Sequence, residues 1–109
     1  MSDISALQKE ALAFRDARDW AQFHNAKDLA AGLSIEASEL LECFLWKDAK
    51  SADPAKIREE LADVLVYALL LVHEAKIDIP SAVRSKLAQN ALKYPVEKAR
   101  GRADKYDQL

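Results

Sequence analysis

Glycine, proline and cysteine are all scarce in this sequence. Its 109 residues include two Gly, three Pro and one Cys. A chain with so few turn-forming residues and so many helix formers (Ala, Leu, Glu and Lys) is predicted to be all-α. Cys43 has no second cysteine in the chain with which to form a disulfide, which is typical of a protein from a reducing compartment.

An excess of charge of either sign is also missing. The chain has 16 basic and 18 acidic residues and a net charge of -2, whereas a nucleic-acid binder is usually strongly basic on one face. The longest apolar run, residues 64–72, is too short to span a bilayer. The first ten residues lack the apolar core of a signal peptide. We therefore expect a cytoplasmic protein that binds neither nucleic acid nor membranes.

Hydrophobic residues are abundant and make up half of the chain, so a core can form. The length suits one small domain, which we assign to residues 1–109. A chain this short still buries a modest share of its surface when it folds. Self-association, as a homodimer or a homotetramer, is therefore expected.

Helical periodicity predicts four helices joined by short segments. They are expected over residues 2–18, 27–47, 54–75 and 81–92. Asp53 and Pro54 form a strong helix start, with Asp as the cap and Pro at the first helical position. Short connections favour an antiparallel, four-helix bundle-like domain. The polar residues 96–109 follow as a C-terminal tail that, left alone, would be mobile.

Carboxylates at i, i+3 spacing stand out on two of these helices, as Glu36/Glu39 and Glu60/Asp63. Such a pair lies on one helical face and can share a ligand. Glu36 falls inside the apolar stripe of its helix, close to Leu29, and a charged carboxylate facing a core needs a partner. Oxygen ligands favour a hard cation such as Mg²⁺ or Mn²⁺. The alternative is that these side chains are solvated surface charges.

A set of short motifs occurs in order over nearly the whole chain. They are RDWAQFH at residues 18–24, EASELLE at 36–42 followed by Trp46-Lys47, EELADVLVY at 59–67, Lys86 and Asn90 followed by KYP at 93–95, and ARG and KY at 99–101 and 105–106. Together they resemble the MazG-like all-α nucleoside triphosphate pyrophosphohydrolases, specifically the dCTP pyrophosphatase branch.

The resemblance implies a role for each matching position. Glu36, Glu39, Glu60 and Asp63 match the catalytic, Mg²⁺-binding carboxylates. The matched substrate-binding positions are Trp20, His24, Trp46, Tyr67, Lys86 and Asn90. Without the resemblance, the aromatic residues among them would be interpreted as core. One departure is Ala11, where some relatives have a His near the base.

The implied reaction is Mg²⁺-dependent cleavage of a nucleoside triphosphate between its α- and β-phosphates, with Mn²⁺ as a possible substitute. The implied substrate is dCTP or a modified dCTP, and the role is cleansing of the nucleotide pool. Two alternatives stay open. One is a related helical hydrolase that acts on dUTP or another nucleotide. The other is a non-catalytic helical oligomerisation or adaptor module.

Overall fold

Helices make up the regular structure of this protein. The computed structural model describes residues 3–109, and no strand occurs among them. The predicted all-α class is confirmed. Contacts divide the chain into two compact units, residues 1–76 and 77–109. Within residues 3–109, no helix combines the length and the apolar character that crossing a bilayer requires.

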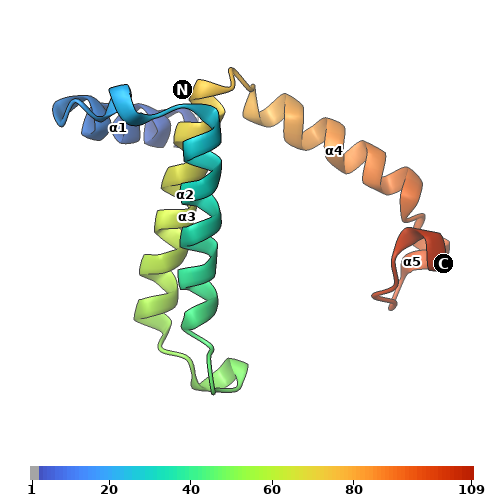
Figure 1. The fold of residues 1–109 in the computed structure, drawn as a ribbon. Coiled ribbons are helices and arrows are strands. Elements are labelled where there is room, and N and C mark those ends of the chain that lie inside the picture. The colour runs from blue at the N-terminus through green and yellow to red at the C-terminus, as the bar shows by residue number, and fades with distance from the viewer. Residues whose placement is uncertain (1–2) are drawn as a thin grey trace. The chain divides into compact units, whose positions relative to one another are not determined.

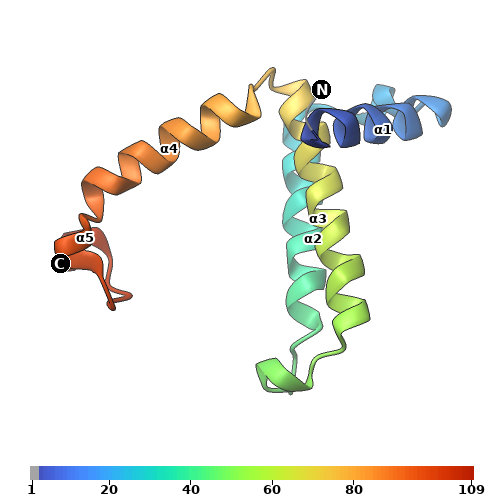
Figure 2. The same cartoon turned by 180° about the vertical axis from the view of Figure 1, so that it is seen from behind.

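The first unit is built around a helical hairpin. Its elements are α1 (Asp3–Ala17), a short 3-10 helix (Trp20–Phe23), α2 (Ala26–Glu42), a second 3-10 helix (Ala49–Ser51) and α3 (Pro54–Glu74). α2 and α3 run antiparallel, side by side, and the loop between them closes the hairpin at one end (Figures 1 and 2). α1 packs against α3 at the open end of the hairpin. The pair of α2 and α3 supplies the antiparallel packing that the predicted bundle requires.

Capping side chains fix where the two hairpin helices begin. The Asn25 side chain accepts a hydrogen bond of 2.8 Å from the backbone N–H of Asp28, which satisfies a free donor in the first turn of α2. Asp53 does the same for Ala55 at 3.0 Å, and Pro54 occupies the first position of α3. Both starts lie within one residue of the positions predicted from sequence.

The end of α2 differs from its prediction. The helix was expected to reach Lys47, but it ends at Glu42. The chain then tightens into i to i−3 turns, such as the 3.0 Å bond from the Phe44 N–H to the Leu41 carbonyl. Trp46 adopts a left-handed φ of 63°, which an α-helix cannot continue. No Gly or Pro lies between Glu42 and Lys47 to indicate this end. The prediction from apolar periodicity therefore extended the helix too far.

The hairpin buries a small core near its open end. Leu29 on α2 is 1% exposed and Leu70 on α3 is 5% exposed. α1 is held to α3 by two polar contacts in addition to apolar packing. The Gln8 side chain donates a 3.1 Å hydrogen bond to the Leu69 carbonyl. The buried Arg15 pairs with Glu74 at 3.4 Å.

The second unit, described by itself, contains α4 and an ordered tail. Its elements are α4 (Ile79–Lys93), α5 (Val96–Ala99) and a 3-10 helix (Tyr106–Gln108). The tail, which was expected to be mobile if left alone, contains two short helices and makes ring contacts with the end of α4. The Tyr106 ring packs edge-on against Tyr94, with ring centroids 6.1 Å apart, and the Lys93 ammonium lies 4.9 Å from the Tyr106 ring. These contacts fold the tail back onto the end of α4.

Candidate active site

Three carboxylates converge between the two arms of the hairpin. Glu36 comes from α2, and Glu60 and Asp63 come from α3. One oxygen from each lies within 4.8 Å of the others. Among the described residues, Oε2 of Glu36 and Oε2 of Glu60 are buried without a hydrogen-bond partner. A buried polar atom without a partner is costly, and a hard cation bound by these oxygens would satisfy both.

Crowding and burial make the carboxyl groups of Glu36 and Glu60 hard to ionise. Hydrogen bonding with Glu39, burial and the neighbouring negative charges raise the pKa of Glu36 to about 7. Burial, followed by the charges of Glu39 and Asp63, raises the pKa of Glu60. A positive ion between the arms would relieve this repulsion and favour the ionised forms.

Glu39 borders this group without belonging to it. The three convergent oxygens come from the other predicted carboxylates, whereas Glu39 lines a neighbouring cavity together with Glu60. The negative charge of Glu39 nevertheless helps to raise the pKa values of Glu36 and Glu60. The four predicted residues are therefore neighbours, but they are not equivalent.

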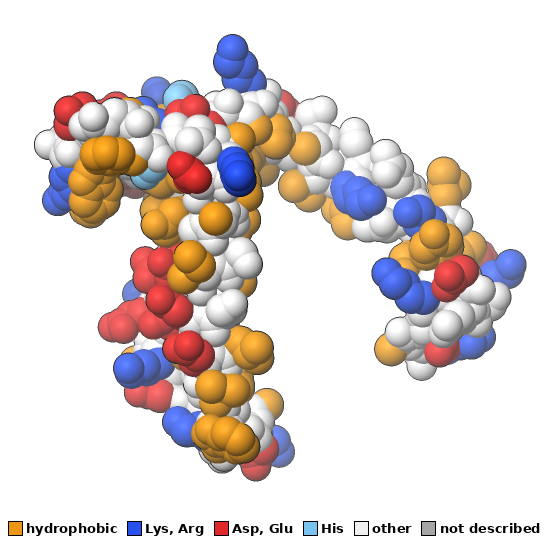
Figure 3. All heavy atoms as spheres, in the orientation of Figure 1, with side chains coloured by type: hydrophobic (Ala, Val, Ile, Leu, Met, Phe, Trp, Pro, Cys, Tyr) orange, Lys and Arg blue, Asp and Glu red, His pale blue; other side chains and the backbone are white. Residues whose placement is uncertain are grey.

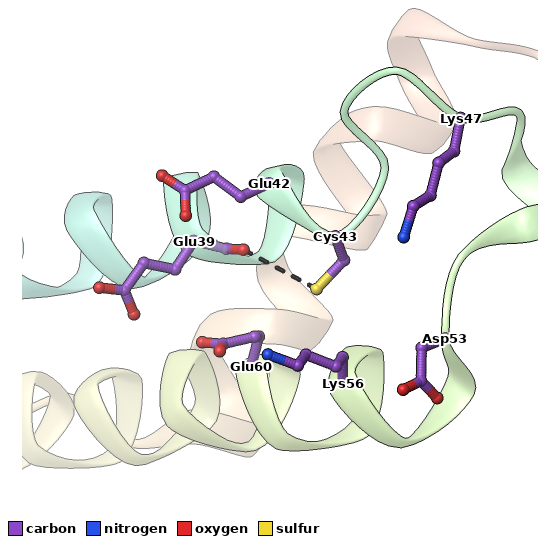
Figure 4. A pocket seen from close by; sticks show the side chains of 7 residues that line it. All are labelled: Glu39, Glu42, Cys43, Lys47, Asp53, Lys56 and Glu60. Carbon is purple, nitrogen blue, oxygen red and sulfur yellow. Dashed lines mark hydrogen bonds between the residues drawn. The ribbon is translucent and has the colours of Figure 1, made fainter.

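The neighbouring cavity lies toward the closed end of the hairpin and has a volume of about 350 Å³. We call it the hairpin cavity. It is lined by Glu39, Glu42, Cys43, Lys47, Asp53, Lys56 and Glu60 (Figure 4). Acidic side chains gather along this part of the hairpin, with basic ones beside them (Figure 3). The cavity thus combines anionic groups near the carboxylate cluster with two lysines further along.

A second cavity, of about 180 Å³, opens on the other side of the carboxylates, beside α1. We call it the aromatic cavity. It is lined by Ala11, Phe14, Arg15, Trp20, His24, Asp63, Val66, Tyr67 and Leu70. Nδ1 of His24 is buried without a hydrogen-bond partner among the described residues. Aromatic faces beside an unsatisfied imidazole suit a flat, polar ligand such as a nucleobase, which stacks and forms hydrogen bonds.

The six predicted substrate-binding residues separate into two sets. Trp20, His24 and Tyr67 share the aromatic cavity with Asp63. The other three residues, Trp46, Lys86 and Asn90, belong to other segments of the chain. Trp46 is 99% exposed at the closed end of the hairpin and therefore belongs to no core of the single chain. Lys86 is exposed and Asn90 is half-buried, both on α4 of the second unit.

Two kinds of residue near the site were not singled out by the sequence. Phe14 lines the aromatic cavity and packs edge-on against Trp20, with centroids 5.8 Å apart. In the sequence, Phe14 recurs with Leu7 and Ala11 at helical spacing, which indicates only an apolar helix face. Lys47 and Lys56 line the hairpin cavity. The sequence could have indicated Lys56, because it lies four residues before Glu60 and residues i and i+4 share a helical face.

Similarity to known proteins agrees with this geometry. The mouse (Mus musculus) and human (Homo sapiens) proteins named dCTP pyrophosphatase 1 are 39% and 38% identical over 117 aligned residues, which cover all of this chain and 67% of each relative. A solved pyrophosphatase structure from Archaeoglobus fulgidus superposes with a TM-score of 0.79 at 36% identity. That match covers 87% of this chain and 94% of the archaeal one.

The family assignment follows from the extent of these matches. Residues 32–109, which include all four candidate carboxylates, match the MazG-like family. The relatives match over the entire length of the chain at identities well above the range where only the fold can be compared. The chain belongs to the MazG-like family.

Proposed function

We propose that this nucleoside triphosphate pyrophosphatase acts on dCTP or a modified dCTP and requires Mg²⁺, with Mn²⁺ as a substitute. The products are the nucleoside monophosphate and pyrophosphate. The dCTP pyrophosphatase names of its relatives support the substrate and the class of reaction. They also favour this activity over a non-catalytic adaptor module. The proposed role is removal of unwanted deoxynucleotides.

One observation carries the proposal for a metal-dependent reaction. Glu36, Glu60 and Asp63 converge from two helices, and two of their oxygens are buried with no partner among the described residues. The donor set is made only of carboxylate oxygens, which Mg²⁺ and Mn²⁺ prefer. When bound, such an ion neutralises phosphate oxygens and lowers the pKa of water.

The chain's own groups would then perform the remaining steps. A water molecule forms a bond to the α-phosphorus, the bond from that phosphorus to the bridging oxygen breaks, and pyrophosphate leaves. Glu39 is our candidate for the group that takes the proton from this water. It borders the convergent oxygens without being one of them, so one of its oxygens can stay available.

Base recognition is assigned to the aromatic cavity. The rings of Trp20 and Tyr67 offer stacking surfaces, and stacking contributes about 1–3 kcal/mol per base. Nδ1 of His24, which lacks a partner among the described residues, is available for a hydrogen bond to the base edge. A pocket that hydrogen-bonds one base discriminates against analogues that leave its polar atoms unpaired.

Self-association completes the proposal. The single chain leaves large apolar side chains of the hairpin exposed, including Ile35, Leu41, Leu65 and the almost fully exposed Trp46. Many large apolar side chains exposed on one hairpin favour an interaction site. We propose that a second copy covers part of it in a homodimer or homotetramer. Light scattering after size-exclusion chromatography tests this, and a monomer at micromolar concentration would contradict it.

The test of activity is direct. The purified chain is incubated in Mg²⁺ with dCTP, 5-methyl-dCTP, dUTP or dATP, each in a separate reaction. The products are resolved by chromatography. We expect dCMP and pyrophosphate from dCTP. Faster turnover of dUTP would replace the proposed substrate while keeping the reaction. The absence of turnover with every nucleotide, in Mg²⁺ and in Mn²⁺, would overturn the proposal.

A further inference from the structure

We propose that Lys56 and Lys47 form a subsite for the two terminal phosphates of the substrate, the part that leaves as pyrophosphate. This inference rests on the proposed function and adds binding residues to it. The subsite is the lysine-lined part of the hairpin cavity, beyond Glu39 and Glu60. Figure 4 shows both lysines and these carboxylates around one cavity.

The order of side chains along α3 supports this assignment. Lys56, Glu60, Asp63 and Tyr67 follow one another at steps of four, three and four residues. At 100° per residue, these steps place all four on one face of the helix. Tyr67 lies in the aromatic cavity, the two carboxylates in the metal-binding group and Lys56 in the hairpin cavity. A nucleotide along this face, with its base at Tyr67, would extend its phosphate chain toward Lys56.

Lys47 approaches the same space from the other side. It follows the end of α2, whereas Lys56 lies in the first turn of α3. The two lysines thus lie on opposite sides of the cavity mouth (Figure 4). Two cations on opposite sides can contact both phosphate groups of a diphosphate and neutralise more of its charge than a single lysine can.

Both lysines remain available to a ligand. Neither forms an ion pair within 4.0 Å among the described residues, although carboxylates line the same cavity. The positive charge of Lys56 is nevertheless close enough to lower the pKa of Glu60, against the stronger effects that raise it. Charged hydrogen bonds to phosphate oxygens are among the stronger ones that proteins make. Such cations would also offset the repulsion between the phosphates and the nearby carboxylates.

Binding of pyrophosphate tests the subsite without relying on turnover. The full chain is titrated with pyrophosphate and with dCMP by calorimetry in Mg²⁺, as wild type, Lys56→Gln and Lys47→Gln. We expect each substitution to weaken pyrophosphate binding about tenfold or more, because a charged hydrogen bond is lost. The affinity for dCMP should be unchanged. Lys56→Arg, which keeps the charge, should recover most of the loss.

The matched control is Lys50→Gln. Lys50 is an exposed lysine in the same hairpin connection, but it does not line the cavity, so its substitution should leave both affinities unchanged. Equal pyrophosphate affinity in wild type, Lys56→Gln and Lys47→Gln would overturn the inference, as would wild-type protein that binds no pyrophosphate. Neither result bears on whether the wild type hydrolyses dCTP, so the failure of the subsite is distinguishable from failure of the proposed function.

Discussion

The backbone of Gly32 on α2 lies directly against the ring of Tyr67 on α3. A Cβ atom added at Gly32 would lie 2.8 Å from Cδ1 of that ring, and closer still to its neighbour Cε1. Glycine inside a helix costs about 1 kcal/mol relative to alanine. The close approach gives a physical reason for tolerating that cost, since it lets the Tyr67 ring lie between the arms and line the aromatic cavity.

Gly32→Ala should therefore damage substrate binding while leaving the helix intact. The added methyl group must displace the Tyr67 ring, so we expect the KM for dCTP to rise about tenfold, within the range of one lost stacking contact. Steady-state kinetics measures this. Ser34→Ala, at an exposed position of the same helix, is the control. An unchanged KM in Gly32→Ala would contradict the assignment of Tyr67 to the base.

Glu36→Gln should abolish metal-dependent activity. Partners of metal ligands alone contribute about 10–100-fold to affinity or activity, so loss of a ligand should lower kcat/KM by more than about 100-fold. Glu59→Gln, an exposed neighbour of Glu60, is the control and should retain activity. Full activity in Glu36→Gln with dCTP and Mg²⁺ would move the metal site away from these carboxylates.

The same substitution should stabilise the metal-free protein at alkaline pH. The folded-state pKa of Glu36 is raised to about 7 from an ordinary 4.5, so folding favours the protonated carboxyl. That contribution is fully present below pH 4.5 and is lost as the pH rises through 7. Glutamine stays neutral throughout. We expect the Tm of Glu36→Gln in EDTA to exceed that of the wild type by a few degrees at pH 8 and to match it near pH 4.5.

Mg²⁺ should reverse this difference. A ligand that binds the folded state raises its stability by an amount that grows with the logarithm of its affinity. Adding Mg²⁺ at pH 8 should therefore raise the Tm of the wild type and have little effect on Glu36→Gln. Equal shifts in both proteins would show that Glu36 takes no part in binding the ion.

The sequence predicted the starts of α2 and α3 better than the end of α2. Asn25 and Asp53 are capping residues that can be recognised in any chain, because they act on donors two or three residues away. The end of α2 depends instead on the left-handed backbone of Trp46, for which the sequence offers no typical residue. Capping residues could be recognised in the sequence. A helix end that depends on the geometry of the connection could not.

The candidate site, like the helix bounds, could be predicted only in part. Helical spacing paired Glu60 with Asp63, and the position of Glu36 in an apolar stripe indicated that it faces the other arm. The separation of Glu39 from the convergent oxygens depends on how two helices pack, which spacing within one helix cannot determine. The four predicted metal-binding residues therefore stay a prediction, within which the structure distinguishes three convergent carboxylates from one at the border.

Ala11 offers a test of base specificity. It lines both the aromatic cavity and an adjacent groove between α1 and α3, whose lining includes Leu7, Leu65 and Leu69. A larger side chain there would fill space next to the proposed base. Ala11→His adds a hydrogen-bonding ring, and polar contacts to a base edge discriminate strongly. We expect the ratio of kcat/KM for dCTP over dUTP to change at least about tenfold. Ala13→His, exposed on the same helix, should leave the ratio unchanged.

The pair of Arg15 and Glu74 should contribute to stability by joining α1 to the end of α3. The Arg15 side chain is 10% exposed and that of Glu74 is 30% exposed, with 3.4 Å between their charged atoms. Arg15→Met removes the charge but keeps an apolar stem, and it leaves a partly buried carboxylate without its partner. We expect a loss of about 1–3 kcal/mol in the free energy of unfolding, below the range for fully buried pairs.

Urea unfolding of the wild type and four variants separates the contribution of this ion pair from that of its surroundings. Asp16 also contacts Arg15, at 2.8 Å, but its side chain is 57% exposed, so Asp16→Asn should cost less than about 1 kcal/mol. Glu74→Gln removes the orphaned charge, so the double variant Arg15→Met/Glu74→Gln should be more stable than the sum of its single changes predicts. Additive changes would mean that the ion pair between Arg15 and Glu74 contributes nothing to the helix junction.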